Sequence, residues 1–84
     1  MKRGDMMLRY ELIENNDEFV SYRYFPEGEK QFGTLDVRKH DKEIIEQEVA
    51  PNDDFKWCFW KILRRIEKFI DSSHFEEKGI IAWY

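Results

Sequence analysis

Short segments with an alternating pattern fill the first half of the chain. Residues 8–12 alternate between apolar and polar side chains, as a half-buried strand does. Turn-forming residues follow at 15–17, at Pro26 and Gly28, and in the polar run 39–42. The pattern therefore predicts an antiparallel meander of four short strands, over about residues 7–13, 18–25, 32–38 and 43–49.

The alternation also predicts which side chains share a face of this sheet. Inward-facing positions of the second and third strands are Val20, Tyr22, Tyr24, Leu35 and Val37. The opposite face, which we expect to stay open, collects Phe19, Phe25 and Phe32. In the fourth strand, Ile45 and Val49 are expected to share one face, opposite Ile44, Glu46 and Glu48.

After Pro51 the apolar spacing changes from two to between three and four, which predicts a helix over about residues 54–72. Either Asn52 or Asp53 is suited to cap its first turn by accepting bonds from free N–H groups. One apolar stripe runs along the helix and consists of Phe55, Cys58, Phe59, Ile62, Leu63, Ile66, Phe69 and Ile70. The polar run 72–74 ends the helix.

The last segment, residues 79–84, reads as a fifth strand, and Phe75 before it is expected to tuck back onto the core. Pairing beside the first strand keeps the whole sheet antiparallel, whereas pairing beside the fourth would need a parallel crossover. We expect the first arrangement. The sequence thus predicts one α+β domain over residues 1–84, with a single amphipathic helix packed on one face of the sheet.

Composition supports one small domain with a dense aromatic core. The chain has 84 residues, of which 17% are aromatic, 42% hydrophobic and 38% charged. No charged start followed by an apolar run is visible, and no apolar run approaches the roughly 20 residues of a membrane span. We therefore expect a soluble cytoplasmic protein, bacterial by its size and style.

Charge is unevenly distributed along the chain. The net charge is −4, which argues against a general nucleic-acid binder. Residues 11–54 contain 13 acids and 5 bases, whereas residues 55–72 contain 5 bases and 2 acids. The acidic and basic parts are expected to attract each other, within one chain or between copies.

Candidate chemistry is sparse. Cys58 lies on the apolar stripe of the helix, where burial makes a thiol inert. His40 falls in a turn and His74 at the helix end, where the helix dipole favours it. The one local cluster of metal-ligand types, which lacks a ligand spacing, is His74 with Asp71, Glu76 and Glu77. The glycines are scattered rather than grouped in a phosphate loop. We therefore expect no catalytic residues, no cofactor and no metal.

Parts of the chain resemble a group of small uncharacterised bacterial proteins that often end in Ala-Trp-Tyr. The resemblance rests on Asp54, Trp57, residues 65–69, residues 75–79 and residues 82–84, together with Tyr22, Tyr24 and residues 26–28. It covers most of the chain and implies a single domain. It implies no activity, cofactor or substrate, so no functional residue is carried over from it.

The outer side of the helix needs an explanation. On a helical wheel, Trp57 and Trp60 fall opposite the apolar stripe, beside Lys61, Arg64 and Lys68. One interpretation is that the C-terminal segment or the loop at Phe75 covers Trp60 within the monomer. The other is an interface, because Trp and Arg are the residue types most enriched at binding hot spots.

Three functions follow from these features. The leading hypothesis is a non-enzymatic interaction module, in contact with a second copy or with an unidentified protein through Trp57, Trp60, Lys61, Arg64 and Lys68. The alternative is a small-ligand binder that uses the open sheet face and its tyrosines. Nucleic-acid binding through the helix ranks third, because the chain is acidic.

Overall fold

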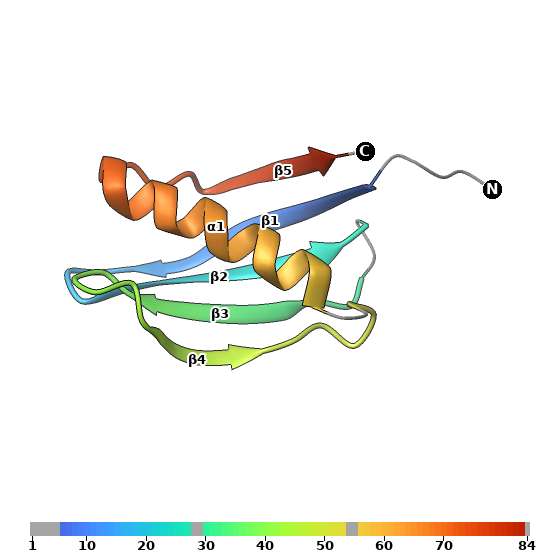
Figure 1. Cartoon of the computed structure of the whole chain (residues 1–84), viewed down its shortest axis with the longest axis horizontal. Helices are drawn as coiled ribbons and strands as arrows, with labels where there is room; N and C mark the ends of the chain where they lie inside the picture. Colours follow the sequence, from blue (N-terminus) through green and yellow to red (C-terminus); the bar gives the residue numbers. More distant parts are fainter. Residues whose placement is uncertain (1–5, 28–29, 54–55, 84) are drawn as a thin grey trace.

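The chain forms a five-stranded sheet with one helix across one face. The computed structural model describes residues 6–27, 30–53 and 56–83. In chain order the elements are β1 (Met6–Asn15), β2 (Phe19–Pro26), β3 (Gly33–Arg38), β4 (Ile44–Glu48), α1 (Trp57–Ser72) and β5 (Lys78–Trp83). The strand order is β4-β3-β2-β1-β5, and every neighbouring pair is antiparallel (Figure 1). The predicted α+β fold is confirmed.

The C-terminal strand completes the sheet beside the first strand. Leu8 pairs with Ile81, and Glu11 pairs with Lys78. The expectation that β5 pairs with β1 rather than with β4 is therefore confirmed. The predicted strand ran to Tyr84, which lies outside the described residues.

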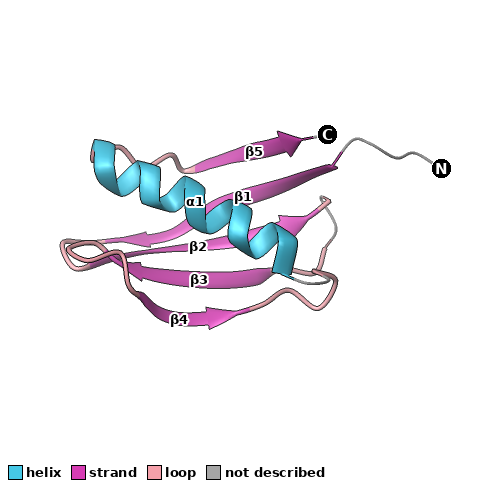
Figure 2. Cartoon of the chain, in the orientation of Figure 1, coloured by secondary structure: helices cyan, strands magenta, loops and turns pink. Residues whose placement is uncertain are grey.

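The core lies between the sheet and α1, which runs diagonally over the central strands (Figure 2). From the sheet it takes Leu8, Tyr10, Val20, Tyr22, Tyr24, Leu35, Val37 and Ile81. From α1 it takes Cys58, Phe59, Ile62, Leu63, Ile66 and Phe69, which are buried as the apolar stripe predicts. Phe55, also assigned to the stripe, lies outside the described residues.

Backbone conformation determines both ends of α1. The helix begins at Trp57, after Lys56, whose φ of 57° is left-handed and outside the helical range. The predicted start at residue 54 lies outside the described residues. At the other end Ser73 also has a left-handed φ of 57°, and its N–H donates to Ile70 O. The N–H of His74 donates to Phe69 O, which closes the last turn.

Asp53 caps α1 although it is separated from the first helical residue by Lys56 and the two residues before it. Its Oδ1 accepts from the N–H of Cys58 at 2.9 Å, and its Oδ2 accepts from the N–H of Phe59 at 2.9 Å. The hydroxyl of Tyr24 donates to the same Oδ2 at 3.2 Å and accepts from the N–H of Ala50 at 3.1 Å. The buried carboxylate therefore ties the helix start to the middle of the sheet.

The other two core tyrosines tie the segment after α1 to the sheet. The hydroxyl of Tyr10 donates to Glu76 Oε1 at 2.8 Å, and the hydroxyl of Tyr22 donates to Glu76 O at 2.6 Å. Phe75 packs against Phe69 with ring centroids 6.3 Å apart, so it tucks back onto the core as expected.

The face assignment within β4 is wrong. Val37 pairs with Ile44, but Asp36 pairs with Glu46, so the register shifts and Ile45 is an extra residue. Because a bulge changes the alternation by one position, Ile44 and Val49 both pack against the core while Ile45 is 45% exposed.

Candidate interaction surface

The outer side of α1 carries the two tryptophans at neighbouring helical positions. We call Trp57, Trp60, Lys61 and Arg64 the Trp ridge; their spacing of three, one and three residues places them on one side of a helix. Trp57 is 58% exposed and Trp60 is 51% exposed. Lys68, one turn beyond Arg64, is exposed on the same side. The predicted outward position of both indoles agrees with these exposures.

Contacts on the inner edge hold Trp60 in place without covering it. Its ring meets Phe59 edge-on, with centroids 5.2 Å apart and planes at 81°. Lys56 Nζ lies 6.0 Å from the Trp60 centroid and 5.2 Å from that of Phe59. Phe75, considered as a cover for Trp60, packs on Phe69 instead. Trp60 keeps these contacts and is still 51% exposed, so its indole is available to another molecule.

An open surface hollow of about 700 Å³ lies at the Trp ridge and is lined by Trp57, Trp60, Lys61 and Arg64. Two tryptophans and two long cationic side chains line it, so apolar and cationic residues meet in one place. This chemistry suits an apolar group that carries a negative charge beside it.

The open face of the sheet is built differently. Arg9 lies over the Phe25 ring, 3.9 Å from its centroid, and Phe32 packs on the same ring at 5.3 Å. Glu11 pairs with Arg9 at 2.7 Å and with Arg23 at 3.8 Å. These contacts cover Phe25, which is only 8% exposed, whereas Phe32 in the same predicted row remains 44% exposed.

The tyrosines expected to serve an open-face ligand site point to the other side. Tyr10, Tyr22 and Tyr24 are 0–1% exposed between sheet and helix, with their hydroxyls bonded inside the protein. Burial raises the pKa of Tyr22 and Tyr24 well above the usual value, and it raises that of Tyr10, where the hydrogen bond to Glu76 adds to the shift. These groups are structural, and they lie out of reach of a ligand on the open face.

Cys58 is buried beside the capping carboxylate. Desolvation, with a smaller contribution from Asp53, raises the pKa of its thiol to about 12. Because the thiolate is the reactive form, this thiol is unreactive in the folded protein.

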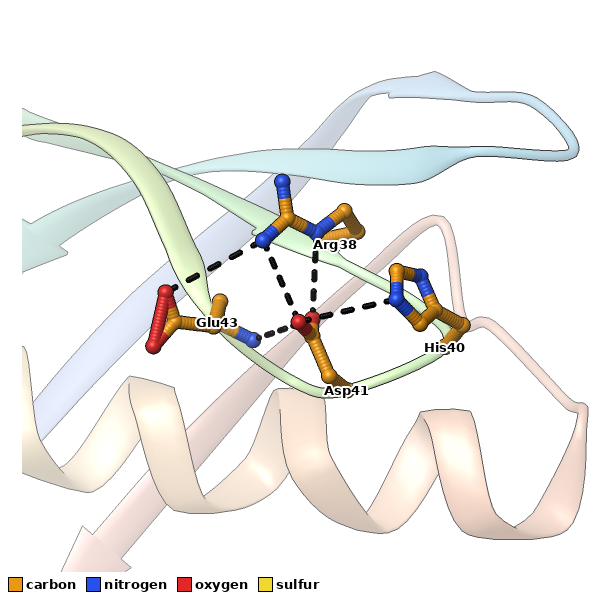
Figure 3. A network of polar contacts seen from close by, with 4 residues as sticks. All are labelled: Arg38, His40, Asp41 and Glu43. Carbon is orange, nitrogen blue, oxygen red and sulfur yellow. Dashed lines mark hydrogen bonds and ion pairs between the residues drawn. The ribbon is translucent and has the colours of Figure 1, made fainter.

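The β3–β4 turn carries a polar network (Figure 3). Arg38 donates to both carboxylate oxygens of Asp41 at 3.1 Å, and Arg38 Nη2 lies 3.9 Å from Glu43 Oε1. His40 Nε2 lies 3.6 Å from Asp41 Oδ2. The hydrogen bonds from Arg38 lower the pKa of the Asp41 carboxyl. The network closes a solvent-exposed turn, and His40 in it is exposed.

The residues considered as a metal cluster make other contacts. Asp71 pairs with Lys42 at 2.6 Å, and Glu76 accepts from Tyr10. Within residues 6–27, 30–53 and 56–83, no three His, Cys, Asp or Glu side chains are grouped to hold a metal ion.

In the same part of the chain, no helix has both the length and the apolar character needed to cross a membrane.

In comparisons with known proteins, no family model, curated protein or solved structure matches the chain.

Proposed function

We propose that this protein is a non-enzymatic interaction module that binds a protein partner through the Trp ridge. The observation that carries the proposal is the exposure of two tryptophans, 58% and 51%, on the outer side of a helix whose inner side holds the core. Large exposed apolar side chains that gather in one place mark binding surfaces more often than isolated ones do.

Residue types in the ridge support a protein contact. Tryptophan and arginine carry binding energy because each buries a large flat surface and keeps a polar group for a directed bond. Both indoles sit on a regular helix, and Trp60 is braced by Phe59. Little side-chain freedom is therefore lost when a partner binds, which favours affinity.

Charge selects the kind of partner. Lys61 and Arg64 belong to the ridge, and Lys56 and Lys68 lie beside it. A partner with an apolar pocket rimmed by carboxylates complements this surface. A second copy packed ridge to ridge would bring cations of two chains together, which opposes association. We therefore propose an acidic partner here rather than the self-contact expected from the sequence.

The experiment is a selection of peptides from a displayed random library on the immobilised protein. We expect enriched peptides to combine Leu, Phe or Trp with Asp or Glu, and to bind more weakly as salt is raised. Trp60→Glu should reduce their affinity by about thirtyfold or more, which corresponds to the roughly 2 kcal/mol that defines a hot spot.

A matched control is Ile13→Glu, which changes another exposed apolar residue, 43% exposed, on β1. Peptides that bind wild type and Ile13→Glu equally but lose Trp60→Glu support the proposal. Peptides that bind all three proteins equally would contradict it. Tight, salt-dependent quenching of tryptophan fluorescence by a thymidine oligonucleotide would indicate that the Trp ridge binds single-stranded nucleic acid rather than a protein.

A further inference from the structure

The two edges of the sheet differ in how they are protected. β4 forms one edge, with the sequence IIEQE, two glutamates and a register shift against β3. Charged side chains and bulges are the devices that prevent an edge strand from pairing with another chain. The β4 edge is therefore guarded against association.

β5 forms the other edge and lacks this protection. Its sequence is KGIIAW, in which Lys78 is the sole charged residue, and its pairing with β1 runs from Glu11–Lys78 to Met6–Trp83 without a register shift. Ile80 is 57% exposed, and Ala82 is also exposed. α1 lies over the central strands and leaves the outer side of β5 uncovered (Figure 1).

The direction of the backbone groups of β5 follows from one hydrogen bond. Glu77 O accepts from the N–H of Leu12 at 2.7 Å, so residue 77 points its backbone groups toward β1. In an antiparallel pair this direction alternates along the strand, so Gly79 and Ile81 also point toward β1. The N–H and C=O groups of Lys78, Ile80 and Ala82 point away from the sheet.

We propose that β5 pairs antiparallel with β5 of a second copy, about a twofold axis at Ile80. In this register Ile80 lies opposite the partner's Ile80, and Lys78 lies opposite the partner's Ala82. Every outward N–H and C=O of these three residues then has a partner across the axis. The two sheets join into one continuous antiparallel sheet.

Side-chain chemistry favours this register. Two residues that lie opposite each other across the axis must have their side chains on the same face of the joined sheet. Only registers that place even-numbered residues opposite even-numbered residues, and odd-numbered opposite odd-numbered, meet this condition. Centring on Ile80 places two exposed isoleucines in contact on the open face and keeps each Lys78 opposite a small apolar residue. On the helix side, Gly79 lies opposite the partner's Ile81 and leaves room for it. Like charges do not face each other directly in this arrangement.

The twofold axis also determines how the two Trp ridges of the dimer are oriented. A twofold axis perpendicular to the sheet leaves each α1 on the same side of the joined sheet. Two Trp ridges are then displayed in the same direction, so a partner with two binding segments gains avidity. The β5 pairing does not depend on the proposed role of the ridge, because it uses different residues.

Solution mass by size exclusion and light scattering tests the pairing. We expect wild type to be a dimer at micromolar concentration and Ile80→Glu to be a monomer, because two carboxylates would meet at the axis. Ile80 lies opposite Arg9 on β1, so a glutamate there suits the folded monomer. The matched control is Ile45→Glu, an exposed isoleucine on the guarded edge, which should remain a dimer.

Cysteine crosslinking tests the register. Residues opposite each other in a hydrogen-bonded pair have Cα atoms about 5.5 Å apart, within disulfide range. Oxidised Ile80→Cys should run as a covalent dimer on a non-reducing gel, and Ala82→Cys should not. Cys58 is buried and serves as an internal negative control.

Three results would overturn the proposal. Wild type that remains a monomer at high concentration excludes the pairing. A dimer that survives Ile80→Glu but is lost in Trp60→Glu places self-association on the Trp ridge instead. Crosslinking at residue 82 without crosslinking at residue 80 excludes this register.

Discussion

The two faces of the sheet bury their aromatic rings in different ways. On the helix side, Tyr10, Tyr22 and Tyr24 lie under α1 and bond their hydroxyls to groups distant in sequence. On the open side, Phe25 is covered by Arg9 and Phe32. The first face is sealed by a helix, and the second is screened by long side chains that stay in contact with water.

The difference shows how an 84-residue chain stabilises a sheet with a single helix. A domain of this size buries only about 60–65% of the surface its unfolded chain exposes, so each buried contact counts. The helix side supplies dense packing and directed hydrogen bonds. The open side supplies cation–π and ion-pair contacts, which are individually weaker. Stability should therefore depend unequally on the two faces.

The largest effect is expected from Phe59→Ala. Phe59 lies on the buried side of α1 with its ring against Tyr24, and it is fully buried. Removal of the ring leaves a cavity that costs about 3–5 kcal/mol of unfolding free energy. The matched change on the open side is Phe32→Ala, at a ring that is 44% exposed, with an expected cost of about 1 kcal/mol. Urea denaturation measures both. Equal losses of unfolding free energy would contradict the expectation that the helix side contributes more to stability than the open side.

Asp53→Ala should cost about 1–3 kcal/mol, because two helix N–H groups and the Tyr24 hydroxyl lose one shared acceptor. Thermal unfolding followed by circular dichroism measures the loss. Asp17→Ala, at an exposed position in the β1–β2 turn, is the control and should change stability by no more than about 0.5 kcal/mol. A loss no larger than that of the control would show that the cap contributes nothing.

High pH should destabilise the fold through the tyrosines of the helix side. The raised pKa values of Tyr10, Tyr22 and Tyr24 mean that the unfolded chain releases these protons more readily than the folded one. Their contribution is complete below about pH 10, the usual tyrosine pKa, and falls as pH rises toward the folded values. Tyrosinate absorbance and circular dichroism should therefore change together above that pH. Ionisation of these tyrosines near pH 10 with the fold intact would contradict the burial argument.

The smallest effect is expected on the open face. Glu11→Gln removes the carboxylate shared by Arg9 and Arg23 and should cost about 0.2–1 kcal/mol at low salt, and less at high salt. Glu46→Gln provides a contrast of sign, because Glu46 lies opposite Asp36 and its neutralisation relieves a like-charge pair. Urea titrations at two salt concentrations measure both changes. A salt-independent loss in Glu11→Gln would indicate packing rather than charge.

Local patterns account for the elements that the sequence predicted well. Alternation placed Val20, Tyr22 and Tyr24 on one face, and the spacing of Phe59, Ile62 and other residues identified the buried side of the helix. The outward direction of Trp57 and Trp60 followed from the same spacing. Such predictions succeed because side-chain direction within a strand or helix depends on backbone geometry alone.

The face of Ile45 shows where local patterns fail. Its side was predicted from strict alternation, but a register shift against β3 makes Ile45 an extra residue and turns it to solvent. A bulge depends on how two strands fit, and the sequence of β4 alone carries no sign of it. The sequence does carry a signal for the proposed edge contact. β5 has one charged residue, whereas β4 has two glutamates.

The sequence by itself therefore determined the elements, their apolar sides and the α+β class, because these follow from the short-range geometry of the backbone. Only the tertiary structure decided which groups satisfy the buried tyrosines. Glu76 bonds Tyr10 across 66 positions of sequence, and Asp53 reaches Tyr24 across 29. It also decided where β4 shifts its register against β3. Such contacts depend on chain segments that meet only after folding, and no periodicity within one segment encodes them.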